Sequence, residues 1–104
     1  MTAEGLPEGG TVVRVDGELD MATTPEFEEV VDDVGAGSRL VIDLSKCTFL
    51  DSSAVRVLVS VARDAEETGG TVAVVAADPG ILRVLEIAAV DRMLPVHATL
   101  DSAI

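Results

Sequence analysis

The alternation of apolar runs with a segment of helical periodicity constrains the fold of this chain more than any other feature. The runs SRLVIDLS (38–45) and TVAVVAA (71–77) are nearly continuous in apolar residues, which is typical of strands covered by helices. Between them, residues 53–67 repeat apolar side chains at helical spacing and end before Gly69 and Gly70. The stripe predicted to be buried consists of Val55, Leu58, Val59 and Ala62, with Arg56, Arg63 and Glu67 on the other side. Strand, helix and strand in this order indicate an α/β domain with right-handed crossovers.

The remaining segments extend this alternation in both directions. TVVRVDGEL (11–19) is rich in β-branched residues, and it predicts either two short strands or one strand bent at Gly17. Thr24 and Pro25 are typical of an N-cap and a first helical position, and they precede a helical pattern that ends at Gly35. The rest of the chain predicts a helix from Asp78-Pro79, a last strand at 95–99 and the stub of a last helix at 100–104. We therefore predict one mixed sheet with helices between its strands.

The charge of the chain limits its partners. Seven Lys and Arg residues stand against 19 Asp and Glu residues, which gives a formal net charge of −12. Such a field repels a phosphate backbone and attracts basic proteins, so we expect no nucleic-acid partner. No apolar run approaches the roughly 20 residues of a membrane-spanning helix, and MTAEGLPEGG is not a signal peptide. We expect a cytoplasmic protein without a membrane partner.

The chain has one cysteine, Cys47, and one histidine, His97, which lie far apart in the sequence. This composition does not indicate a metal site, and we expect no cofactor. For Cys47, the interpretation as a small buried apolar group is preferred over a redox role. For His97, a late strand position or a surface contact is preferred over catalysis.

The stretch FLDSSA (49–54) lies at the turn from the strand at 38–45 into the helix at 53–67. Asp51 or Ser52 is suited to cap this helix, because its side-chain oxygen can accept a bond from a free backbone N–H. Three polar residues in succession exceed what capping requires. A helix N-terminus also favours a phosphate group, so a modified or nucleophilic serine remains open beside a role in capping alone.

The surroundings of the two serines argue against an enzyme. A serine hydrolase at such a turn requires glycines around the serine and a histidine base. Here the flanking residues are Asp51 and Ala54, and His97 is the only histidine. Phosphate-binding glycine loops are also missing from the sequence, and its only lysine is Lys46. We expect a protein without catalytic activity.

Two segments resemble the STAS domain family of anti-sigma factor antagonists. VIDLSKCTFLDSSAVRVLV is similar to the family's strand, Asp-Ser-Ser-Gly turn and helix, and GELDMATTPEFEEVV is similar to its earlier strand end and helix. The resemblance implies one STAS domain at 11–104 with a mixed sheet of four to five strands and three to four helices mainly on one face. Residues 1–10 are expected to be a short N-terminal segment that could be flexible, with the family's first strand reduced or missing.

The resemblance also implies a phosphorylation switch in bacterial transcription regulation. In such proteins the unphosphorylated form binds an anti-sigma factor that is also a serine kinase, and sigma factor is released. Phosphorylation of the serine after the aspartate ends binding, and a serine phosphatase restores it. Mapped by motif, that serine is Ser52, and Asp43 matches the aspartate of the central strand. The flanking and partner-binding positions are Asp20, Thr23, Asp51, Ser53, Ala54 and Arg56.

Some features of the resemblance leave alternatives open. Ala54 replaces the glycine that usually follows the two serines, which could alter the approach of a partner. The alternative function is a structural subunit of a stress-signalling scaffold or a lipid-transport complex, in which Ser52 is only a helix cap. We expect a monomer or a weak dimer.

Overall fold

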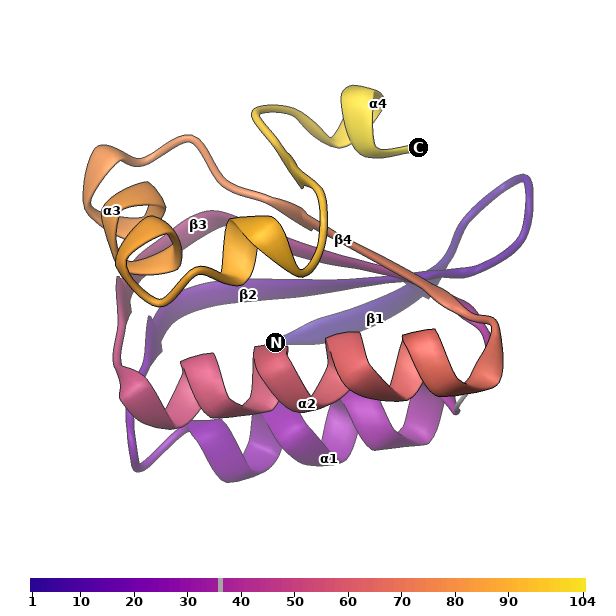
Figure 1. The fold of residues 1–104 in the computed structure, drawn as a ribbon, viewed down its shortest axis with the longest axis horizontal. Coiled ribbons are helices and arrows are strands. Elements are labelled where there is room, and N and C mark those ends of the chain that lie inside the picture. The colour runs from indigo at the N-terminus through magenta and orange to yellow at the C-terminus, as the bar shows by residue number, and fades with distance from the viewer. Residues whose placement is uncertain (36) are drawn as a thin grey trace.

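The computed structural model describes residues 1–35 and 37–104, and these residues form one five-stranded sheet, four α-helices and a short 3-10 helix (Figure 1). In chain order the elements are β1 Thr2–Gly5, β2 Thr11–Leu19, α1 Thr24–Val34, β3 Arg39–Leu50, α2 Ser52–Thr68, β4 Thr71–Val75, α3 Pro79–Ile87, the 3-10 helix η1 Val90–Arg92, β5 Val96–His97 and α4 Leu100–Ala103. The prediction of a mixed α/β sheet is confirmed. No helix of the described residues is long and apolar enough to cross a membrane.

The strands lie in the order β1-β2-β3-β4-β5, with β1 antiparallel to β2 and all other neighbours parallel. At the centre, Leu40 pairs with Thr11 of β2 on one side and with Val72 of β4 on the other. The first strand, expected to be reduced or missing, is present with four residues. It turns into β2 through a tight loop in which the amide of Leu6 donates to the carbonyl of Gly10 at 2.9 Å.

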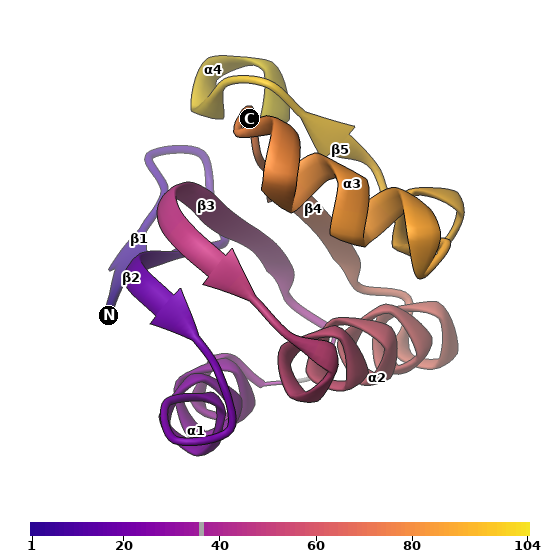
Figure 2. The ribbon, with the colours of Figure 1, turned by 90° about the vertical axis from the view of Figure 1, so that its left-hand side faces the viewer.

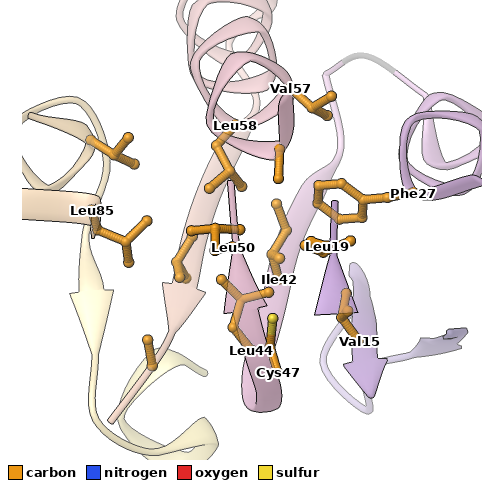
Figure 3. Close-up of a cluster of buried hydrophobic side chains, with 14 of the residues drawn as sticks. Val15, Leu19, Phe27, Ile42, Leu44, Cys47, Leu50, Val57, Leu58 and Leu85 are labelled. Carbon is orange, nitrogen blue, oxygen red and sulfur yellow. The ribbon is translucent and has the colours of Figure 1, made fainter. Parts of the chain in front are cut away.

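Most helices cover one face of the sheet, as predicted. Helices α1 and α2 lie side by side on this face, and α3 extends the layer over β3 and β4 (Figures 1 and 2). Their main core contains Phe27 from α1, Leu58 from α2 and Leu85 from α3 (Figure 3). Helix α4 lies on the other face, where Leu100 and Ala103 pack against a small cluster. That cluster consists of Val12, Val41 and Val75.

Strand β3 is longer than the sequence predicted. The sequence predicts a strand over 38–45, but residues 46–50 continue this strand to Leu50. They pair with the end of β2 through two register shifts, and Gly17 takes a left-handed φ of 91° between them. Only glycine adopts this φ without strain, so β2 bends and keeps β3 paired. The chain at 11–19 is therefore one bent strand.

The buried face of α2 differs in part from the predicted stripe. Leu58 is fully buried, Ala62 is buried and Arg56 is exposed, as expected. However, Val55 and Val59 are only half-buried, whereas Val57 is buried at 5% exposure. The reason is that α2 packs on α1 as well as on the sheet, which moves its buried side toward Val57.

Candidate functional site

The ends of β2 and β3 and the starts of α1 and α2 meet at one edge of the sheet (Figure 2). Leu19 and Leu50 are cross-strand partners, and both are buried. The amide of Asp51 donates to the carbonyl of Leu19 at 3.1 Å. This bond brings the turn after β3 next to the loop after β2, and so it joins the two sequence motifs in one site.

Asp51 is the N-cap of α2. Its backbone is extended, and its Oδ1 accepts hydrogen bonds from the amides of Ser53 at 2.9 Å and Ala54 at 3.3 Å. The hydrogen bond from the Ser53 hydroxyl, assisted by the backbone amides of Ala54, Ser53 and Met21, holds the pKa of Asp51 below its ordinary value against a smaller opposing effect of burial. Of the two capping residues left open by the sequence, the structure selects Asp51, and Ser52 is not the cap.

The two serines of the motif differ in their surroundings. Ser53 is half-buried, and its hydroxyl donates to Oδ1 of Asp51 at 2.5 Å. The same hydroxyl lies 3.0 Å from the hydroxyl of Thr24 in α1. Ser52 is the first residue of α2 and is exposed, and within the described residues its side chain has no hydrogen-bond partner. Only Ser52 therefore offers a free hydroxyl to a partner.

The loop after β2 is held by Asp20 and Thr23. Oδ1 of Asp20 accepts from the amides of Ala22 at 2.9 Å and Thr23 at 3.1 Å, and the Thr23 hydroxyl donates to the carbonyl of Glu18 at 2.8 Å. The predicted N-cap Thr24 is wrong by one residue, because Thr23 is the N-cap and Thr24 begins the helix. The carboxylate of Asp20 therefore accepts hydrogen bonds within its own loop.

Two exposed apolar side chains in this region were not identified by the sequence analysis. Met21, in the loop after β2, is 80% exposed, and Phe49, two residues before Asp51, is 49% exposed. Neither residue type carries a recognisable signal by itself, since isolated apolar residues occur on most surfaces. Arg56 is exposed one turn after Ser52, while Ala54 is fully buried and directs no atoms to the surface.

Asp43, which the resemblance matched to the central strand, lies apart from the serines. It is 8% exposed, and its Oδ1 accepts from the amide of Ser45 at 3.0 Å. Its Oδ2 lies 3.8 Å from Nε of Arg14 in a loose ion pair. Its contacts are therefore structural, within the sheet, and do not reach Ser52.

Ser52 is exposed at the start of α2. Two of the larger hollows, of about 570 and 300 Å³, are lined by the second half of α2 and by neither serine.

In the described part of the chain, no three His, Cys, Asp or Glu residues are grouped to hold a metal. Cys47 is buried, its Sγ lies 3.2 Å from the carbonyl oxygen of Phe49, and burial raises the pKa of its thiol. The exposed start of α2 around Ser52 therefore suits recognition by a protein.

Comparison with known proteins identifies the family. The STAS domain model matches residues 2–103, so the chain belongs to the STAS domain family. The resemblance noted from the two motifs is thereby confirmed.

Individual relatives share most of their length with the chain. The anti-sigma-F factor antagonist RsfA of Mycobacterium tuberculosis is 27% identical over 101 residues, covering 93% of this chain and 79% of RsfA. The crystal structure of an anti-sigma factor antagonist from Mycobacterium paratuberculosis is 35% identical, with a TM-score of 0.89, covering 98% of this chain and 87% of that chain.

SpoIIAA, an anti-sigma factor antagonist, shares the fold in two states. Its unphosphorylated form is 21% identical with a TM-score of 0.81, covering 98% of this chain and 90% of that one. The phosphorylated form from Bacillus is 19% identical with a TM-score of 0.72, covering 98% and 94%.

Proposed function

We propose that this protein is an anti-sigma factor antagonist controlled by phosphorylation of Ser52. In its unmodified form it binds an anti-sigma factor that is also a serine kinase, and it thereby releases a sigma factor. The kinase phosphorylates Ser52 and the complex dissociates, after which a serine phosphatase restores the binding form. The names of the mycobacterial relatives support the antagonist role. The phosphorylated form of SpoIIAA indicates that a domain of this fold can carry a phosphate.

The observation that carries the proposal is the difference between the two serines. Ser53 is engaged with Asp51 and Thr24, whereas Ser52 is exposed and has no partner among the described residues. A kinase needs a hydroxyl that can enter its active site and attack the γ-phosphate in line. Ser52 meets this requirement without any rearrangement of the domain.

The position of Ser52 also suits a charge switch. A phosphate there adds roughly −1.5 to −2 charges at the positive end of the α2 dipole. The nearby Asp51 opposes this charge, but its Oδ1 is bonded to the first turn of α2. Because the group projects into solvent from a formed helix end, the domain need not refold. The effect should fall on the interface with the partner.

The site assignment is tested by incubation with the cognate kinase and ATP, followed by intact mass and peptide mapping. We expect one phosphate on Ser52, and we expect Ser52→Ala to abolish it. Ser53→Ala is the matched control, and it should still accept a phosphate on Ser52. Phosphate on Ser53 in the wild-type protein, or unchanged modification of Ser52→Ala, would contradict the assignment.

The switch is tested by affinity. We expect Ser52→Asp to weaken binding to the anti-sigma factor at least about tenfold, roughly 1.4 kcal/mol, because a partner surface fitted to a neutral hydroxyl meets a desolvated charge. Ser52→Ala should still bind. Backbone chemical shifts should change on phosphorylation only in the Asp20 loop and the start of α2. Equal affinity of the phosphorylated and free forms would exclude the switch.

In the alternative function, the protein is a structural subunit and Ser52 is only a helix cap. Because Asp51 caps α2, that alternative leaves Ser52 without a function in the described structure. Identification of the partner by pull-down with the unmodified protein separates the two, since a structural subunit would retain its partner after kinase treatment.

A further inference from the structure

The hydroxyl of Thr24 lies in an unexpected place. Thr24 belongs to the first turn of α1 and is only 6% exposed, so its hydroxyl needs a partner inside the protein. That partner is the hydroxyl of Ser53 in α2, 3.0 Å away and 29 residues further along the chain. It is the one side-chain contact of Thr24 in the described hydrogen-bond network, and the side chain does not cap its own helix.

The direction of the hydrogen bonds follows from the number of protons. Ser53 has one hydroxyl proton, and it donates this proton to Oδ1 of Asp51, because an ionised carboxylate can only accept. The hydroxyl of Ser53 can then only accept from Thr24, which becomes the donor of the pair. The proton order therefore runs from Thr24 to Ser53 to Asp51, and each bond polarises the next.

We propose that Thr24 is a positioning residue of the Ser52 site, acting through Ser53 and Asp51. This inference rests on the proposed function of Ser52. The chain of hydroxyls turns Oδ1 of Asp51 toward the amides of Ser53 and Ala54. It thereby fixes the orientation of the carboxylate next to Ser52 and ties the start of α2 to the start of α1.

The consequence concerns the geometry of phosphoryl transfer. If Thr24 cannot donate, Ser53 is held by one bond fewer, and the cap and the first turn of α2 become less rigid. The Ser52 hydroxyl is then aligned less often with the γ-phosphate. Such a defect lowers kcat, whereas KM for the protein substrate depends on the wider interface and changes little.

The first test uses the wild-type protein, Thr24→Val, Thr24→Ser and Ser53→Ala, each checked for folding by circular dichroism. The Asp51 carboxyl is titrated by NMR in each protein, without any kinase. We expect the pKa of Asp51 to rise in Ser53→Ala and in Thr24→Val. Thr24→Ser should titrate like the wild-type protein, because it retains the hydroxyl. An unchanged Asp51 titration in Thr24→Val would overturn the positioning role.

The second test measures phosphorylation of Ser52 by the cognate kinase. We expect Thr24→Val to lower kcat by about threefold to tenfold, which corresponds to the free energy of one hydrogen bond. KM should change little. Thr24→Ser should restore the rate, and a loss of kcat that Thr24→Ser shares would contradict the proposal. If the wild-type protein accepts no phosphate on Ser52, the proposed function itself fails. Normal phosphorylation with an unchanged Asp51 titration would instead overturn only the role of Thr24.

Discussion

The starts of α2 and α3 are built on the same plan but differ in one respect. Each helix follows a parallel strand and has an aspartate as its N-cap. Oδ2 of Asp78 accepts one bond, from the amide of Ile81 at 3.0 Å, and Pro79 and Gly80 follow it. Oδ1 of Asp51 accepts from two amides and one hydroxyl, and two serines follow it. The cap of α3 shows that one carboxylate and no serine is enough to cap a helix after a parallel strand of this sheet.

The difference explains what the serines contribute. Ser53 strengthens the cap and connects it to Thr24 of α1, which has no counterpart at α3 among the described contacts. Ser52 contributes to neither role. The serine that the fold does not need is therefore the one that we propose is phosphorylated.

The largest contrast should be between a buried leucine of α2 and an exposed leucine of α3. Leu58 of α2 is fully buried, and Leu82 of α3 is 36% exposed. Leu58→Ala should lower the free energy of unfolding by about 2–5 kcal/mol because it leaves a cavity. Leu82→Ala should cost about 1 kcal/mol or less. Urea denaturation measures both, and equal losses would show that α2 is not anchored through Leu58.

The second contrast concerns the two caps. Asp78→Ala should cost about 1 kcal/mol, the usual value of an N-cap. Asp51→Ala should cost more than Asp78→Ala, since it removes three hydrogen bonds and leaves the hydroxyl of Ser53 without its acceptor. Thermal and urea unfolding at neutral pH provide the comparison.

The pH dependence of Asp51 sharpens this contrast. Its pKa is lowered in the folded state, so its stabilisation is fully present above the ordinary aspartate pKa of about 3.9 and is lost as the pH falls through the lower folded value. The stability difference between the wild-type protein and Asp51→Asn should therefore shrink in that range. A constant difference down to the lowest pH would show that the carboxylate charge plays no part.

The third contrast is between the two serines at the start of α2. Ser53→Ala should lower the free energy of unfolding by about 1 kcal/mol, because it removes the bond to Asp51 and leaves the buried hydroxyl of Thr24 unpaired. Ser52→Ala should change it by less than about 0.5 kcal/mol, as expected for an exposed side chain. If Ser52→Ala is the more costly change, Ser52 has a structural role.

The smallest contrast concerns the ends of the helices. The residue after α2 is Gly69 with a left-handed φ of 79°, while the left-handed residue after α3 is Ala89 with φ of 59°. This conformation costs a non-glycine residue roughly 1–2 kcal/mol, which the greater chain entropy of glycine partly offsets. Ala89→Gly should therefore raise stability by about 0.5 kcal/mol, and Gly69→Ala should lower it by a similar amount. A melting temperature that falls in Ala89→Gly would contradict this.

Much of the fold could be predicted because its signals are local. The periodicity of 53–67 and the apolar runs at 38–45 and 71–77 placed helix and strands in the correct order, and the two motifs identified the family. The extension of β3 to Leu50 could not be predicted in this way. Residues 46–50 form a strand because β2, bent at Gly17, offers them a partner.

Some features of the site follow from the local sequence, and others follow from tertiary packing. The sequence by itself placed Asp51, Ser52 and Ser53 at a helix start, because capping depends on residue types within one turn. The local hydrogen bond from Ser53 to Asp51 already distinguishes the two serines, and the tertiary structure adds the contact between Ser53 and Thr24. The hydroxyl of Ser53 contacts the hydroxyl of Thr24, which lies 29 residues earlier in the chain. This contact exists because α1 and α2 pack side by side on the sheet. A hydrogen bond between helices depends on how the helices pack, which no local sequence pattern encodes.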